Sequence, residues 1–280
     1  MANFHFPFPL LLFAALAFLP DLAHAADTVE HYGGRDMIVH VPPQLPPTGT
    51  RALVVVLHGG LGNADRIAGR QSEAGLNMDA EADAHGFIVA YLNGTPVTRF
   101  MGAKMLGWNA GGGCCGVPAR TNVDDVGYIG GAVGYLAGKY GIDGARVYGI
   151  GHSNGAVMSQ RIVCEVGLFA AIVPISGPLN LDTTRCPGAK GRRILAIHGA
   201  DDRNVPVAGG AGSKGLSGVV WHSEAQSEQV MAAAGARYTL QIVPGADHKL
   251  DHIDAAILTS EGTTIGEKAA RFFGMAGDHP

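Results

Sequence analysis

The stretch GIGHSNGAV at residues 150–158 places one serine between two glycines, with the spacing Gly151, Ser153, Gly155. The apolar segment RVYGI precedes this serine, and a segment with helical periodicity follows it. A serine at a sharp strand-to-helix turn is held in a strained backbone conformation, and flanking glycines let the strand and the helix pack closely around it. The pattern also fits a serine that only caps a helix. The strand before and the helix after favour a nucleophile at Ser153.

A serine nucleophile needs a base to take its proton and an acid to orient that base. In turns of this kind the chain order is serine, acid, histidine. The order argues against Asp124 and Asp125, which are expected to place negative charge at the start of a helix capped by Asn122. The downstream candidates for the acid are Asp182, Asp201 and Asp202. We favour Asp202, which follows the apolar run ILAIHG.

The candidates for the base are His222, His248, His252 and His279. His248 lies in the turn GADHKL, just beyond the apolar run YTLQIVP, at the sheet edge where Ser153 should emerge. His222 precedes a helical stretch, His252 begins the next segment, and His279 is in the C-terminal tail. We therefore expect His248 to be the base.

Acyl transfer also needs N–H groups that stabilise the negative oxygen of the intermediate. The N–H of Asn154 is one candidate, because it lies at the start of the helix after Ser153. The second donor is expected in the segment LHGGLGNA, from Gly60 or Leu61. His58 in the same segment is expected to brace the loop. Neither G-x-G-x-x-G nor a P-loop lysine occurs here, which argues against a phosphate-binding loop.

The elements that must position these residues are short apolar runs alternating with helical segments. Near-continuous apolar runs are typical of strands buried on both faces of a parallel sheet. The predicted strands are 36–41, 52–58, 87–92, 146–150, 170–176, 193–199 and 238–244. The predicted helices are about 66–85, 123–140, 154–166, 223–234 and 261–274. This alternation predicts a doubly wound α/β sheet with an antiparallel N-terminal hairpin turning at Gly33-Gly34.

The chain has 280 residues, of which 47% are hydrophobic and 16% charged, with a formal net charge of -4. This balance argues against nucleic acid as a partner. Residues 1–25 contain the apolar stretch PLLLFAALAFLP and end in AHA. That stretch is too short to span a membrane, so we expect a signal peptide that is cut after Ala25. Residues 26–280 then form one secreted or periplasmic domain with no membrane anchor.

The four cysteines, Cys114, Cys115, Cys164 and Cys186, are an even number in a chain expected to be exported. Export favours disulfide bonds, with three connectivities open. We favour Cys164–Cys186, which would join the end of a helix to the loop after the next strand. Cys114 and Cys115 would then bond to each other or remain free thiols. No C-x-x-C spacing occurs, so no metal site is expected.

Four segments resemble secreted α/β-hydrolases of the polyhydroxybutyrate-depolymerase and feruloyl or acetyl-xylan esterase type. They are LHGGLGNA, the run from GWNAGGGCCG to VDDVGYI, RVYGIGHSNGAVMSQRIVCE, and ILAIHGADDRNVP followed by GADH. The resemblance implies the α/β-hydrolase fold, Asp202 as the acid and His248 as the base. It also implies that Trp108 forms a wall of the substrate cleft, although an aromatic side chain packed under a glycine loop fits Trp108 equally well.

We therefore expect a secreted carboxylic-ester hydrolase that uses Ser153, Asp202 and His248 and needs no cofactor. The expected substrates are polyhydroxyalkanoate esters, feruloyl or acetyl esters of plant polysaccharide, or small esters. Two alternatives remain open, a serine peptidase on the same scaffold and a non-catalytic binding protein. Lys249 stands where related enzymes often carry an aromatic residue, which leaves the acyl preference open. The oligomeric state is open as well.

Overall fold

The computed structural model describes residues 1, 25–69, 76–98, 105–215 and 217–276. The predicted signal peptide lies almost wholly outside these residues, as does His279. In the described part of the chain, no helix is long and apolar enough to cross a membrane.

One eight-stranded sheet runs through the described residues, in the order β1-β2-β4-β3-β7-β8-β9-β12. All neighbouring pairs from β4 to β12 are parallel. Only β2 runs antiparallel to its neighbours, β1 and β4. The predicted mostly parallel sheet with an N-terminal hairpin is therefore confirmed. In sheet order the strands are β1 (Ala26–Tyr32), β2 (Arg35–Val41), β4 (Ile88–Leu92), β3 (Arg51–Leu57), β7 (Ile142–His152), β8 (Ala171–Ile175), β9 (Arg193–Gly199) and β12 (Arg237–Val243).

Two short antiparallel pairs lie outside the main sheet, β5 (Thr95–Pro96) with β6 (Leu106–Gly107) and β10 (Gly210–Ala211) with β11 (Val220–Trp221). The helices in the described residues are α1 (Ala64–Ile67), α2 (Met78–His85), α3 (Gly116–Arg120), α4 (Asp125–Tyr140), α5 (Asn154–Glu165), α6 (Glu224–Ala233), α7 (Leu250–Glu261) and α8 (Ile265–Phe273).

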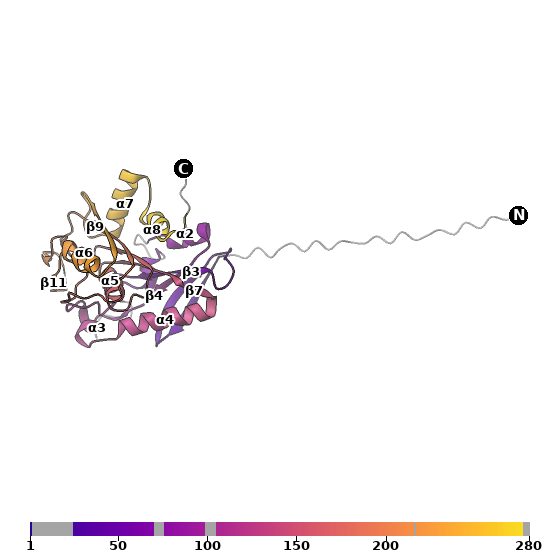
Figure 1. Ribbon diagram of the computed structural model, residues 1–280, viewed down its shortest axis with the longest axis horizontal. Coiled ribbons are helices and arrows are strands. Elements are labelled where there is room, and N and C mark those ends of the chain that lie inside the picture. The colour runs from indigo at the N-terminus through magenta and orange to yellow at the C-terminus, as the bar shows by residue number, and fades with distance from the viewer. Residues whose placement is uncertain (2–24, 70–75, 99–104, 216, 277–280) are drawn as a thin grey trace.

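Along β3, Leu53 and Val55 belong to one core, and Val54 and Val56 belong to the other. Helices α4, α5 and α6 pack in the first core, and α1, α2, α7 and α8 in the second. Figure 1 shows α4 on one side of the sheet, with α7 and α8 on the other.

One predicted helix is wrong, and one helix of the structure was not predicted. The segment 66–85 is not one helix, because α1 ends at Ile67 and α2 begins only after Asn77, whose φ is 52°. The left-handed conformation of Asn77 cannot continue a right-handed helix. Helix α7 was not predicted at all, and Gly262 ends it with a φ of 70° before α8 begins at Ile265.

The predicted cap of α4 is also wrong. Asn122 has a φ of 51° and lies before the helix, where its side chain accepts a hydrogen bond from Asn109. Asp124 is the cap, because its carboxylate accepts from the backbone N–H of Gly127 at 2.8 Å. Either side chain can cap a helix, so the sequence could not distinguish the two.

Parallel strands end at the same edge of a sheet. Strands β3, β7, β9 and β12 are all parallel in the order given above, so the loops after them meet at one edge. These four loops carry the segments with Gly60, Ser153, Asp202 and His248.

Candidate active site

Ser153 occupies the tight turn between β7 and α5. Its φ is 53° and its ψ is -120°, a conformation that costs a non-glycine residue on the order of 1–3 kcal/mol. A Cβ on Gly151 would lie 2.5 Å from the carbonyl oxygen of Gly155, and a Cβ on Gly155 would lie 2.1 Å from that of Leu57. Both positions therefore exclude every side chain, which explains the two glycines around the serine.

Ser153, His248 and Asp202 form one continuous chain of hydrogen bonds. Nε2 of His248 lies 2.9 Å from the Ser153 hydroxyl, and Nδ1 lies 2.7 Å from Oδ2 of Asp202. A carboxylate only accepts, so Nδ1 carries the proton and Nε2 of the neutral ring accepts from the serine. The His248 side chain is 15% exposed, whereas that of Asp202 is fully buried.

Three hydrogen bonds and one ion pair hold the Asp202 carboxylate. Oδ1 accepts from the backbone N–H groups of Asn204 and Val205 at 2.8 and 2.9 Å. Oδ2 accepts from His248 and lies 3.2 Å from Nε2 of His198. Burial raises the pKa of the Asp202 carboxyl, but the hydrogen bonds from His198 and His248 outweigh burial and hold that pKa below its ordinary value. Asp202 is therefore ionised and fixed in orientation.

The other acid and base candidates lie elsewhere. Asp201 is exposed, although it directly precedes Asp202 in the chain. Asp182 is almost fully exposed and lies 3.2 Å from His222. His252 pairs with Asp247 at 2.9 Å, on the exposed start of α7. None of these side chains contacts Ser153 in the described residues.

Two backbone N–H groups beside Ser153, those of Gly60 and Asn154, are the candidate oxyanion donors. A Cβ on Gly60 would lie 3.7 Å from Cβ of Asn154, so the two residues are neighbours beside Ser153. Among the described residues, no acceptor takes either N–H. The alternative donor, Leu61, is wrong, because its N–H already donates to the carbonyl oxygen of Leu106 at 2.8 Å.

Trp108 does not form a wall of a cleft. Its side chain is fully buried, and its Nε1 donates to the carbonyl oxygen of His58 at 3.0 Å. The indole instead packs under the glycine loop at the end of β3, with its ring 5.0 Å from the His58 ring. Burial lowers the pKa of His58 to about 4, so the His58 ring is neutral. Its Nδ1 donates to Gly59 and its Nε2 accepts from Gly94, which braces the loop.

His152, next to the serine, was not identified from the sequence. Its Nε2 donates to the carbonyl oxygen of His248 at 2.8 Å, and the two rings lie 5.0 Å apart. Burial, together with the nearby His248, lowers the pKa of His152 to about 4. The neutral His152 therefore holds the backbone of His248 against the turn that carries Ser153.

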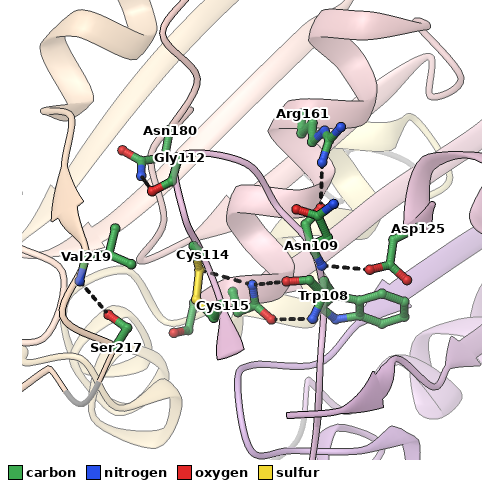
Figure 2. Close-up of a disulfide and its surroundings, with 12 residues drawn as sticks. Trp108, Asn109, Gly112, Cys114, Cys115, Asp125, Arg161, Asn180, Ser217 and Val219 are labelled. Carbon is green, nitrogen blue, oxygen red and sulfur yellow. Dashed lines mark hydrogen bonds between the residues drawn. A yellow bond between two sulfur atoms is a disulfide. The ribbon is translucent and has the colours of Figure 1, made fainter. Parts of the chain in front are cut away.

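The Asn154 side chain ties the oxyanion turn to the disulfide loop. Its Oδ1 accepts from the Trp108 N–H at 2.7 Å, and its Nδ2 donates to the Trp108 carbonyl and to Sγ of Cys114. Cys114 and Cys115 are joined by a disulfide across a cis peptide bond. Figure 2 shows this disulfide beside Trp108, with Asn180 contacting Gly112 on the far side of the loop.

Two more interactions hold this loop in place. Asp125, fully buried at the start of α4, accepts from the N–H of Asn109 at 2.6 Å and from Arg35 at 2.6 Å. Arg161 on α5 donates to the carbonyl of Asn109, as Figure 2 shows. The second disulfide, Cys164–Cys186, joins the end of α5 to the segment before β9. Asp125 thus has a structural role, because it anchors the loop through the N–H of Asn109.

One group of potential metal ligands occurs in the described residues, namely Asp27, His40 and Asp79. His40 contacts Asp27 through Nδ1 and Asp83 through Nε2, both at 2.9 Å. Burial lowers the pKa of His40, but the hydrogen bonds to these carboxylates outweigh burial, so the pKa lies above its ordinary value. The cluster joins β1, β2 and α2 near the sheet edge opposite β12.

Comparison with known proteins places this geometry in a wider context. No family model matches the chain. The sequence is 31% identical over 179 residues to the "Putative esterase NocK" of Nocardia uniformis subsp. tsuyamanensis, a match that covers 61% of this chain and 46% of that protein. It is 28% identical over 180 residues to Feruloyl esterase B of Piromyces equi, covering 63% of this chain and 31% of that protein. The matches thus span less than half the length of either relative.

Among solved structures, a truncated carbohydrate esterase from gut microbiota superimposes with a TM-score of 0.58 at 15% identity. The superposition covers 91% of this chain and 97% of that one. At such low identity the likeness concerns the fold alone. The parallel sheet, the strand–serine–helix turn and this superposition agree, and the chain has the α/β-hydrolase fold.

Proposed function

We propose that this protein is a serine carboxylic-ester hydrolase. Ser153 is the nucleophile, His248 is the base, and the Asp202 carboxylate orients the base. The observation that carries the proposal is the unbroken hydrogen-bond chain from the Ser153 hydroxyl through His248 to the ionised Asp202. The similarity of the sequence to two esterases supports ester substrates.

In the first half of the reaction, His248 Nε2 takes the proton of Ser153 as its oxygen bonds to the ester carbon. The carbonyl π electrons move onto oxygen, where the N–H groups of Gly60 and Asn154 receive the negative charge. The charge of Asp202 stabilises the imidazolium. When the intermediate collapses, the alcohol leaves with the proton from His248, and Ser153 carries the acyl group.

In the second half, water attacks the acyl group while His248 takes one of its protons. The same two N–H groups stabilise the second oxyanion, and the carboxylic acid is released as Ser153 regains its proton. His152 contributes by holding the His248 backbone, since its Nε2 donates to the His248 carbonyl.

The first experiment measures hydrolysis of p-nitrophenyl acetate and butyrate by the wild type and by Ser153→Ala. We expect kcat of Ser153→Ala to fall about 10⁶-fold, to a level that only binding and oxyanion contacts support. Ser260→Ala is the matched control, because Ser260 lies on the exposed side of α7 and its hydroxyl only contacts the preceding turn. Equal turnover by the wild type and Ser153→Ala would overturn the proposal.

For the substrate class, we propose polyhydroxyalkanoate-type esters or feruloyl and acetyl esters of plant polysaccharide. The similarity to a protein named as a feruloyl esterase favours the second group. A panel of hydroxybutyrate oligomers, methyl ferulate and acetylated xylan ranks these by kcat/KM. Cleavage of peptide amides in preference to every ester would support a serine peptidase, and no turnover of either would support a binding protein.

We also propose that residues 1–25 are a signal peptide and that residues 26–280 are one exported catalytic domain. The expected cut after Ala25 falls directly before β1, so it would leave the sheet complete. The intact mass of the exported protein tests this, because it should begin at Ala26. A mass that includes residues 1–25 would contradict the proposal.

A further inference from the structure

Behind Asp202 lies a buried charged group that the proposed reaction does not use directly. His198, at the end of β9, has a fully buried side chain between two carboxylates. Its Nδ1 lies 2.7 Å from Oε1 of Glu224, the first residue of α6, which is also buried. Tyr238 on β12 donates its hydroxyl to the other oxygen of Glu224 at 2.8 Å. A chain of polar groups therefore runs from Tyr238 to Asp202.

The partners of His198 determine its protonation state. Its Nε2 lies 2.8 Å from the carbonyl oxygen of Val205, which can only accept, so Nε2 carries a proton. Its Nδ1 faces the Glu224 carboxylate, which favours a second proton there. Burial lowers the pKa of His198, but the hydrogen bonds to Asp202 and Glu224 outweigh burial and raise that pKa to about 9. At neutral pH the ring is an imidazolium.

We propose that His198, as an imidazolium neutralised by Glu224, is a positioning residue that aims Asp202 at His248 and sets the pH range in which His248 acts as a base. This inference rests on the proposed function of Ser153, His248 and Asp202. His198 touches neither substrate nor the reacting atoms, and it acts through the Asp202 carboxylate.

The positioning follows from the donors around Asp202. Two backbone N–H groups hold Oδ1, and His248 donates to Oδ2. The Nε2–H of His198 donates to the Val205 carbonyl and also lies 3.2 Å from Oδ2 of Asp202, as an ion pair. With His198 removed, Oδ2 keeps one donor, and the carboxylate gains freedom to turn away from His248. A catalytic group that is displaced in this way costs up to about 100-fold in rate.

The effect on pH follows from charge. The positive charge of His198 lies beside the same oxygen that attracts the proton on His248, so it opposes protonation of His248. Glu224 lies on the far side of His198 and reduces this effect without cancelling it. The other groups facing His198 are Asp202 from its own loop, Tyr238 from β12 through Glu224, and the neutral His152 at the end of β7. Removing His198 should therefore move the acidic limb of the rate profile to higher pH.

The first test does not depend on catalysis. We would record nitrogen-detected imidazole spectra of ¹⁵N-histidine-labelled protein as a function of pH, with His198→Gln to assign the signal. We expect both nitrogens of His198 to carry protons at pH 7. Tyr238→Phe should shift the titration of His198 to higher pH, because the Glu224 carboxylate without the Tyr238 hydrogen bond attracts the proton on His198 more strongly. A neutral His198 at pH 7 would overturn the inference, whether or not the protein hydrolyses esters.

The second test measures kcat/KM against pH for His198→Gln. We expect a 10- to 100-fold loss and an acidic limb moved to higher pH. His40→Gln is the matched control, because His40 is also buried between two carboxylates but lies on β2. It should lower thermal stability without moving the limb.

If His198→Gln fails to fold, the shift caused by Tyr238→Phe assigns the His198 signal, and the charge of His198 at pH 7 decides the question. An unmoved limb in a folded His198→Gln variant would reduce His198 to a packing role. Ester hydrolysis that survives Ser153→Ala would instead reject the proposed function and leave the spectroscopic result standing.

Discussion

At the scale of single residues, the site depends on which of two adjacent aspartates faces the sheet edge. Asp201 is exposed and Asp202 is buried against His198 and His248. The apolar run before them could not separate the two, because both follow it, and only the resemblance to secreted α/β-hydrolases favoured Asp202. Because their environments differ so strongly, a substitution of Asp201 is a control for the same substitution of Asp202.

We predict that Asp202→Asn lowers kcat about 10⁴-fold, the loss expected when an amide in place of the acid favours the wrong tautomer of the histidine. Asp201→Asn should retain activity close to the wild type. The measurement is kcat for p-nitrophenyl butyrate at pH 8, after circular dichroism confirms that both variants are folded. A large loss in Asp201→Asn with little loss in Asp202→Asn would contradict this assignment.

The pH dependence at this scale follows from the lowered pKa of Asp202. A carboxyl with a depressed folded pKa stays ionised well below the pH at which an ordinary Asp is protonated. Loss of activity on mild acidification should therefore not arise from protonation of Asp202. We expect the acidic limb of the rate profile to disappear when His248, the proposed base, is replaced. His248→Gln should leave a low residual rate with no acidic limb between pH 5 and 8.

At the scale of elements, the turn between β7 and α5 requires glycine at positions where a Cβ would collide with backbone. Gly155 is the sharper case, because its Cβ would lie 2.1 Å from the carbonyl oxygen of Leu57 at the end of β3. Backbone cannot move aside as a flexible side chain can. The close approach of α5 to β3 is what presents Ser153 at the sheet edge.

We predict that Gly155→Ala lowers the free energy of unfolding by at least about 1–3 kcal/mol and abolishes activity. Gly134→Ala on the exposed side of α4 is the control, since its added Cβ meets nothing within 4 Å. That change should stabilise the helix by up to about 1 kcal/mol. Urea denaturation measures both. A Gly155→Ala variant as stable and active as Gly134→Ala would argue against the close packing of this turn.

The elements also show what the sequence could and could not predict. The central strands β3, β4, β8 and β9 were predictable because each is a continuous apolar run that packs between two layers of helices. Helix α7 was missed, and 66–85 was wrongly read as one helix, because local periodicity does not reveal left-handed residues such as Asn77. The catalytic segments were recognisable, but His198, Glu224 and Tyr238 come from three separate elements. No local pattern relates these three residues before the chain folds.

The errors within the site have the same origin. Trp108 carries an amphipathic ring that suits a cleft wall or a packed floor, and only the fold places it beneath the His58 carbonyl. The N–H of Leu61 looked equivalent to that of Gly60 until β6 brought the Leu106 carbonyl to it. Both depend on contacts between segments more than forty residues apart.

At the scale of the whole molecule, the first strand is attached to the body of the protein by a buried carboxylate. Glu30 on β1 accepts from Lys139 at 2.6 and 2.7 Å and from Tyr135 and Tyr140 at 2.8 Å, all on α4. Burial raises the pKa of Glu30, but these hydrogen bonds outweigh burial and lower that pKa to about 2. The edge strand that follows the predicted cleavage site is thus held by a charged interaction.

This interaction predicts that the stabilisation by Glu30 is lost in acid. Because the folded pKa of Glu30 is depressed, its contribution is complete above the ordinary value of 4.5 and is lost as the pH falls from 4.5 toward 2. The urea midpoints of the wild type and Glu30→Gln should therefore differ at pH 7 and converge near pH 2. A constant difference across this range would show that the ionisation of Glu30 does not contribute.

The whole account rests on a Ser153 oxygen made reactive by His248. The most direct measurement is covalent labelling with a fluorophosphonate, followed by peptide mapping in a mass spectrometer. We predict one adduct, on Ser153, that forms quickly in the wild type, far more slowly in His248→Gln and not at all in Ser153→Ala. Labelling of another residue, or equal rates in the wild type and His248→Gln, would contradict the account.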